Sequence, residues 1–302
     1  MSVYHVPVLL KKSVDALNIS ESGVYVDATL GGGGHTEEIL SRLGKKGRLL
    51  VFDRDADAIA NAPDDKRIIT VHNNFRFVQN FTNYYGFDGV DGILADLGVS
   101  SHQFDTPERG FSFRFDADLD MRMNTLAEKS AKDVLNEYEE KDLARIFRLY
   151  GELNNSGRIA GLICEARKNK EIATTGDLHD ALEKILPPQA EHKFLAKIYQ
   201  ALRIEVNGEM TSLEYFLKGA CKSLKAGGIL SVITYQSLED RMVKNFIRSG
   251  NIDGIVEKDL YGKEYSPMEA VNRKPIIPDE EEIQSNTRAR SAKLRIGRKK
   301  QL

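Results

Sequence analysis

The stretch Val24-Tyr-Val-Asp-Ala-Thr-Leu-Gly-Gly-Gly-Gly-His-Thr-Glu-Glu-Ile-Leu40 decides the fold. Val24–Ala28 is an apolar run that suits a buried strand, and Ile39 and Leu40 begin the apolar face of a helix. Four consecutive glycines, Gly31 to Gly34, lie between the two. Because glycine has no Cβ, the N–H groups of such a turn and of the helix N-terminus can close on a polar ligand.

An acid follows at the matching place on the next strand. The apolar run Leu49–Phe52 ends in Asp53. A carboxylate at the carboxyl end of the second strand can accept hydrogen bonds from both ribose hydroxyls of a nucleoside. The alternative is a glycine-rich turn beside a solvated aspartate. The two features together favour a nucleoside-containing cofactor.

The glycine pattern narrows the choice of cofactor. The dinucleotide fingerprint G-x-G-x-x-G fails, because Thr36 stands at its third glycine when counting starts at Gly31. The chain contains no G-x-x-x-x-G-K-[ST], which a P-loop requires. An acid, a glycine-rich turn and a ribose-binding acid are instead the arrangement of S-adenosylmethionine (SAM) enzymes. The sequence therefore predicts SAM as the cofactor.

Two strings carry a resemblance to a known family. Asp27–Thr36 and the segment Asp91-Gly-Ile-Leu-Ala-Asp-Leu-Gly-Val-Ser-Ser-His-Gln103 resemble the ribosomal small-subunit methyltransferase H family, also called MraW. Further strings similar to the family extend from His5 to Arg295. Besides Asp53, which the spacing assigns to the ribose, the resemblance implies cofactor contacts from Gly33, Gly34, His35, Phe75, Asp96 and Gln103. The alternative for Phe75 is ordinary packing with Phe77 and Phe81, since phenylalanine is commonly buried.

The same resemblance implies a reaction, the methylation of N4 of a cytidine in the decoding region of 16S rRNA. An exocyclic amine is a poor nucleophile because its lone pair is delocalised into the ring. A carboxylate that accepts one amine N–H would favour the pyramidal amine, and Asp96 is the catalytic candidate, in competition with its role as a cofactor contact. Methylation at C5 would need a cysteine thiolate, but Cys164 and Cys221 fall on apolar stripes of predicted helices.

Three positions depart from the family pattern. Gln236 stands where a histidine is usual, Tyr235 where a phenylalanine is usual, and Asn124 where an acid is common. Glutamine can hydrogen-bond a base edge but cannot titrate. We therefore interpret the ring nitrogen of the family's usual histidine as a group that positions the substrate and is not essential to the chemistry.

Two other functions fit parts of the same pattern. A nucleotide-dependent oxidoreductase on the same sheet is disfavoured by Thr36. A non-catalytic RNA-binding protein that keeps the fold is disfavoured by the intact Gly33-Gly34-His35, Asp53 and Asp96.

The pattern of apolar runs predicts the fold. Five strand-like runs suit an open α/β sheet: Val24–Ala28, Leu49–Phe52, Ile68–Val71, Gly92–Ala95 and Ile229–Thr234. Residues 252–257 and 292–297 are candidates for two more strands. From 105 to 206 helical periodicity takes over, and Ser130–Asp133 is typical of a capping box at a helix start. Ser237–Asp240 is typical of another helix capping box, after the fifth strand. We expect a class I SAM-dependent methyltransferase, a Rossmann-like open sheet with helices on both faces, made of 1–104 and 207–302, with 105–206 as an inserted helical substrate-recognition domain.

Composition and charge bear on partners. No apolar run reaches the length of a membrane span, and the N-terminus lacks the charge order of a signal peptide, so we expect a cytoplasmic protein without a membrane partner. Net charge is −2, but the segment from Arg288 to Leu302 has basic residues and no acid. This end is either a solvated tail or a phosphate-binding patch, in which Arg288, Arg290 and Arg295 would bind RNA. The expected partner is 16S rRNA within the small ribosomal subunit; a homodimer stays open, and no metal is predicted.

Overall fold

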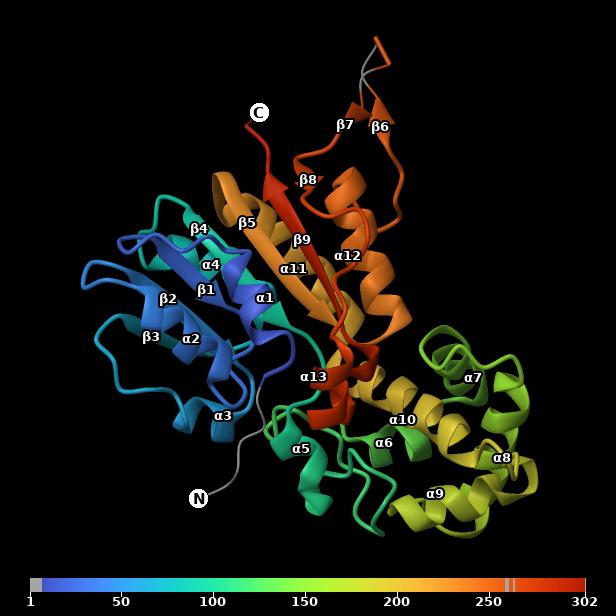
Figure 1. Ribbon diagram of the computed structural model, residues 1–302. Helices are drawn as coiled ribbons and strands as arrows, with labels where there is room; N and C mark the ends of the chain where they lie inside the picture. The colour runs from blue at the N-terminus through green and yellow to red at the C-terminus, as the bar shows by residue number, and fades with distance from the viewer. Residues whose placement is uncertain (1–6, 259–260, 263, 302) are drawn as a thin grey trace. The chain divides into compact units, whose positions relative to one another are not determined.

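The computed structural model describes residues 7–258, 261–262 and 264–301 (Figure 1). The chain divides into two compact units, one of Met1–Gly98 with Met210–Leu302 and one of Val99–Glu209. The second unit therefore begins at Val99 rather than at 105 and ends at Glu209 rather than at 206. Val99 and Phe104 pack against the apolar core of the second unit, which explains the earlier start.

The first unit is built on a seven-stranded sheet in the order β3-β2-β1-β4-β5-β9-β8. Strands β1 to β5 pair in parallel, whereas β9 is antiparallel to both β5 and β8. The strands are β1 Val24–Asp27, β2 Arg48–Asp53, β3 Ile68–His72, β4 Val90–Asp96, β5 Leu224–Thr234, β8 Met268–Ala270 and β9 Lys293–Lys299. The first five contain the five predicted runs almost residue for residue, and β9 corresponds to the candidate at 292–297.

Both faces of this sheet are buried, as parallel sheets require. Along β2, Leu49 and Val51 enter one apolar core while Leu50 and Phe52 enter another, because successive side chains of a strand point to opposite faces. Helices cover the two faces (Figure 1). The helices of this unit are α1 Leu10–Asp15, α2 Gly34–Arg42, α3 Ala56–Ala60, α4 Val78–Tyr84, α11 Glu209–Ser223, α12 Ser237–Ser249 and α13 Glu280–Ser285. The predicted open sheet with helices on both faces is confirmed.

Two local predictions are wrong. Of residues 252–257, only Glu257 enters a strand, in a separate ribbon of β6 (Glu257–Lys258) with β7 (Glu264–Tyr265). The chain before it is a turn, because Asn251 accepts the N–H of Ile255 and donates to its carbonyl. We also expected a helix cap at Ser237.

Ser237 is instead the first residue of α12, and Gln236 is the N-cap of this helix. The cause is Glu239, whose carboxylate reaches back to the backbone N–H groups of Tyr235 and Gln236, at 3.1 and 3.3 Å.

The second unit is helical, as predicted, and has a core of its own. Its helices are α5 Ser101–Asp105, α6 Ala131–Glu137, α7 Glu140–Leu149, α8 Ser156–Asn169, α9 Thr175–Leu182 and α10 Glu191–Asn207, and short 3-10 turns lie at Pro107–Arg109 and Glu183–Ile185. The predicted capping box of Ser130 and Asp133 is present. Cys164 packs in this unit and Cys221 in the sheet unit, so both cysteines are core residues. Among the described residues, no helix has the length and apolarity that crossing a membrane requires.

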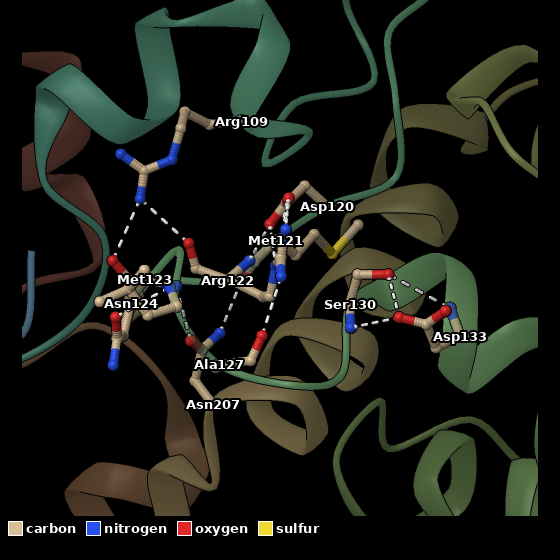
Figure 2. Close-up of polar contacts among 11 residues, drawn as sticks. Arg109, Asp120, Met121, Arg122, Met123, Asn124, Ala127, Ser130, Asp133 and Asn207 are labelled. Carbon is tan, nitrogen blue, oxygen red and sulfur yellow. Dashed lines mark hydrogen bonds and ion pairs between the residues drawn. The ribbon is translucent and has the colours of Figure 1, made fainter.

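Figure 2 shows how the irregular segment before α6 is held. Asn207, the last residue of α10, accepts the N–H of Met123 at 2.8 Å and donates to the carbonyl of Met121 at 2.8 Å. Arg109 donates to the carbonyls of Arg122 and Met123 at 3.0 and 3.1 Å (Figure 2). Met121 and Met123 are buried, so these side chains satisfy backbone groups that the core shields from water.

Replacing Asn207 by alanine should therefore destabilise the helical unit by about 1–3 kcal/mol, because buried backbone groups of Met121 and Met123 lose their partner. Urea unfolding followed by circular dichroism measures the change. The control is Asn124→Ala, which alters an exposed asparagine of the same segment and should shift the unfolding free energy by less than about 0.5 kcal/mol. Equal effects of the two changes would contradict this account of the segment.

Candidate active site

Three aspartates gather at one edge of the sheet. Asp53, Asp27 and Asp96 are the last residues of β2, β1 and β4, which are neighbours in that order. The carboxyl ends of parallel strands form the ligand crevice of open α/β sheets. The sequence predicted Asp53 and Asp96 for this crevice; Asp27 was recognised as part of the motif but not as a site residue.

The glycine turn connects β1 to α2 and holds Asp53. Gly31 and Gly33 have φ of +50° and +84°, a left-handed conformation that favours glycine. The N–H of Gly31 donates to Asp53 Oδ2 at 2.9 Å, and the N–H of Asp55 donates to Oδ1 at 2.9 Å. A carboxylate has about four acceptor sites, so each oxygen can still accept a ribose hydroxyl.

Gly34, the first residue of α2, is constrained in a different way. A Cβ at this position would lie 2.2 Å from Cγ of Pro7, which is far below any contact distance. The predicted Gly33 and Gly34 are therefore required by the local backbone, whatever they contact in a ligand.

Asp27 is completely buried and is stabilised by hydroxyl and amide donors. Thr36 Oγ1 donates to Asp27 Oδ2 at 2.7 Å, and the N–H of Thr29 donates to Oδ1 at 3.1 Å. Burial nevertheless raises the pKa of Asp27 to about 7, and the nearby Asp53 adds to the rise. Burial also raises the pKa of Asp53, against the hydrogen bonds from Asp55 and Gly31.

Asp96 is the third acid, and its backbone N–H donates to Thr29 Oγ1 at 2.7 Å. The hydroxyl of Tyr235 donates to Asp96 Oδ1 at 2.8 Å. Burial, followed by repulsion from Asp27 and Glu239, raises the pKa of Asp96 to about 7, although the bond from Tyr235 acts in the opposite direction. Sequence reasoning noted Tyr235 as a departure from the family, but its contact with Asp96 depends on the pairing of β4 with β5.

His35 lies beside this acid on the second residue of α2. Its Nδ1 is 3.9 Å from Asp96 Oδ2, and the ring is only 4% exposed. Burial lowers the pKa of His35 to about 4, so the imidazole is neutral at physiological pH. Its Nε2 is buried without a hydrogen-bond partner among the residues that the structure describes. A neutral ring with an unused nitrogen suits a polar ligand contact.

These features can be tested against the cofactor that the sequence predicts. Clustered, partly protonated carboxylates favour a ligand that brings positive charge, because a cation relieves their mutual repulsion. SAM has positive charges on its sulfonium and ammonium groups and a ribose for Asp53. A dinucleotide would instead bring its pyrophosphate toward the acids. The residues present therefore fit SAM, which would be held by the glycine turn, Asp53 and Asp96.

The other two predicted cofactor residues, Phe75 and Gln103, both make contacts within the protein. Phe75 begins the 3-10 turn Phe75–Phe77 and contacts Phe216 edge to face, with ring centroids 5.1 Å apart. It is partly buried in the sheet unit and packs against the same apolar core as Phe81. Gln103 belongs to the helical unit, where its side chain and that of Ser100 form the capping box of α5. The cofactor contacts of both residues stay predictions.

The basic end divides into two environments. Arg288 and Arg290 lie in the 3-10 turn Thr287–Ser291, and Arg290 is exposed. Arg295 on β9 instead makes a two-pronged ion pair with Asp240 of α12, through Nε at 2.5 Å and Nη2 at 3.1 Å. The Arg295 and Asp240 side chains are only 11% and 14% exposed, and their ion pair connects β9 to α12. Its geometry favours a structural role for Arg295 over the predicted contact with phosphate.

The sheet order, with β9 antiparallel between β5 and β8, is that of the class I SAM-dependent methyltransferases. The chain belongs to the MraW methylase family, whose model matches residues 2–300. It is 56% identical over 299 residues to a Bacteroides fragilis protein, covering 99% of this chain and 98% of that one. A Flavobacterium johnsoniae protein is 55% identical over 296 residues, covering 98% of each. Both proteins are named "Ribosomal RNA small subunit methyltransferase H". Neither the oxidoreductase nor the non-catalytic alternative is supported.

The role of Asp53 can be measured directly. Asp53→Ala should weaken SAM binding by about 1.5–3 kcal/mol, the scale of hydrogen bonds to a charged group. Isothermal titration calorimetry measures the affinity, and thermal unfolding checks that the turn survives the loss of the Gly31 and Asp55 contacts. The control, Asp64→Ala, removes an equal charge from an exposed position and should leave SAM affinity unchanged. Unaltered binding by folded Asp53→Ala would move the ribose contact elsewhere.

Proposed function

We propose that this chain methylates N4 of a cytidine in the decoding region of 16S rRNA, within the small ribosomal subunit. The family and the names of its relatives support rRNA of the small subunit as the substrate. The observation that carries the chemistry is Asp96, a partly buried carboxylate at the end of β4 that keeps one oxygen, Oδ2, facing the side of His35. The substrate implies the cytoplasm as the place of action.

The reaction that we propose needs an acceptor for an amine N–H. When bound, SAM supplies a methyl group: the N4 lone pair forms the new C–N bond as the C–S bond breaks and its electron pair stays on sulfur. The product amine then loses one proton. Asp96 can accept an N4 hydrogen bond as positive charge develops, which favours the pyramidal amine and directs the proton toward the carboxylate.

The rest of the chain would bring the nucleotide to this edge. A cytidine in folded RNA must leave its stack to reach a partly buried acid, at a cost of a few kcal/mol. We assign the recognition of the surrounding RNA to the helical unit Val99–Glu209 and to the basic turn with the partly buried Arg288 and the exposed Arg290. All residues of the described site come from one chain, so the proposal applies to a monomer and to a homodimer alike.

The decisive experiment identifies the product. Small subunits from cells that lack this protein should contain N4-methylcytidine after incubation with the enzyme and SAM, as measured by nucleoside mass spectrometry. Asp96→Asn should slow single-turnover transfer at saturating SAM by roughly 100-fold or more, the scale of general base catalysis. A normal rate at saturation, with only SAM affinity reduced, would confine Asp96 to cofactor binding.

The matched control for this experiment is the double change Cys164→Ser with Cys221→Ser, which should retain transfer in a folded protein because no thiolate is needed at N4. The appearance of 5-methylcytidine, or the loss of transfer in that folded control, would overturn the proposed chemistry.

The basic turn predicts a salt dependence. Replacing Arg288 and Arg290 by glutamine should flatten the slope of log affinity for RNA against log salt by about one unit per lost phosphate contact. Lys46→Gln is the control, because it removes an exposed charge just before β2, at the amino ends of the strands. Arg295→Gln should instead lower stability and leave the slope unchanged. If replacing Arg288 and Arg290 leaves the slope unchanged, the segment is a solvated surface that does not contact phosphate.

A further inference from the structure

Tyr235 follows β5 directly and lies beside the proposed acceptor. Because β5 pairs with β4, with Ile233 opposite Asp96, the residue after β5 comes next to the carboxyl end of β4. The Tyr235 hydroxyl donates to Asp96 Oδ1 at 2.8 Å. Within the described part of the chain, it is the side-chain donor within hydrogen-bond distance of the Asp96 carboxylate.

The position of the Tyr235 ring is fixed from two sides. Its backbone N–H donates to Oε2 of Glu239, which is 3% exposed and anchored in the first turn of α12. On the other side lies Gly98, at φ +118°, where a Cβ would be 3.4 Å from Cδ2 of Tyr235. The backbone after β4 therefore packs against the ring without an intervening side chain, and the hydroxyl has little freedom to leave Asp96.

The groups around Asp96 make this single donor important. Asp27 from β1 and Glu239 from α12 are acids and favour protonation of Asp96. His35 from α2 is neutral, because burial lowers its pKa to about 4, and its Nδ1 is 3.9 Å away. The hydrogen bond from Tyr235 is thus the interaction that opposes the rise in the pKa of Asp96. Burial, followed by the charges of Asp96, Glu239 and Glu282 of α13, raises the pKa of the Tyr235 phenol, so the hydroxyl stays protonated as a donor.

We propose that Tyr235 is a positioning residue for methyl transfer: its hydroxyl fixes Oδ1 of Asp96 and leaves Oδ2 to accept the N–H of the substrate amine. This inference rests on the proposed function. The tyrosine acts only through Asp96, and its hydroxyl gives no proton away during the reaction. The hydrogen bond from Tyr235 holds the Asp96 carboxylate in one orientation and keeps it ionised among other acids.

The sign of the pH effect follows from the hydrogen bond. The bond stabilises the ionised form of Asp96, so its loss raises the pKa of that acid. A reaction that needs ionised Asp96 speeds up as pH rises through this pKa. Removing the hydroxyl therefore moves the acidic limb of the rate profile to higher pH.

The test is Tyr235→Phe, which keeps the ring and removes only the hydroxyl. Single-turnover transfer at saturating SAM should show the acidic limb shifted upward by roughly one pH unit, with a rate about three- to tenfold lower near pH 7. Because the rate is measured at saturating SAM, a change in SAM affinity does not enter the comparison. Fluorinated tyrosine at position 235, a stronger donor, should move the limb in the opposite direction.

Tyr25→Phe is the matched control. Tyr25 is also a buried tyrosine of the sheet unit, and its hydroxyl accepts the N–H of Ser20 at 2.8 Å. This change should lower stability without moving the pH profile. In an Asp96→Asn background, Tyr235→Phe should have little further effect on the rate, because the two residues act together.

An unchanged profile in folded Tyr235→Phe, or additive losses in the double variant, would overturn this inference while leaving the proposed function intact. If wild-type enzyme forms no N4-methylcytidine, the proposed function itself fails, so the two failures can be told apart.

Discussion

The gathering of Asp27, Asp53 and Asp96 at one edge of the sheet is the constraint on which the site depends. Parallel strands bring their carboxyl ends together, and here three neighbouring strands each end in an aspartate. Burial is the main cause that raises the pKa values of Asp27 and Asp96 to about 7, and repulsion from neighbouring acids adds to the rise. The surrounding chain supplies donors to each acid, namely threonine and tyrosine hydroxyls and backbone N–H groups.

This constraint makes the site suited to a cation. Each donor satisfies part of a carboxylate, but no described lysine or arginine forms an ion pair with Asp27, Asp53 or Asp96. Positive charge brought by SAM would complete the electrostatics and stabilise the ionised acids. Binding the cofactor and preparing Asp96 as an acceptor would then be the same event. The fold thus links ligand occupancy to the protonation state that the proposed transfer requires.

The sequence predicted the features that depend on residues close together in the chain. The parallel strands β1, β2, β4 and β5 are buried on both faces and appear as continuous apolar runs, and the glycines, Asp53 and Asp96 lie next to those runs. β8 has only three residues, of which Glu269 and Ala270 are exposed, so its pairing with β9 leaves no local signal. The contacts of Tyr235 with Asp96 and of Arg295 with Asp240 join distant segments, and neither can be predicted without strand pairing or helix packing.

Thr36 departs from the dinucleotide motif and has a different role in this protein. A glycine at this position in dinucleotide-binding proteins lets the helix pack closely on the strand. Here Thr36 is completely buried, and its hydroxyl occupies that space to donate to Asp27 at 2.7 Å. Without this donor, Asp27 would lose a hydrogen bond that favours its ionised form in a site that is already crowded with acids. The residue that excludes the dinucleotide fingerprint is therefore also the one that allows an acid to end β1, and with it a crevice suited to a cationic cofactor.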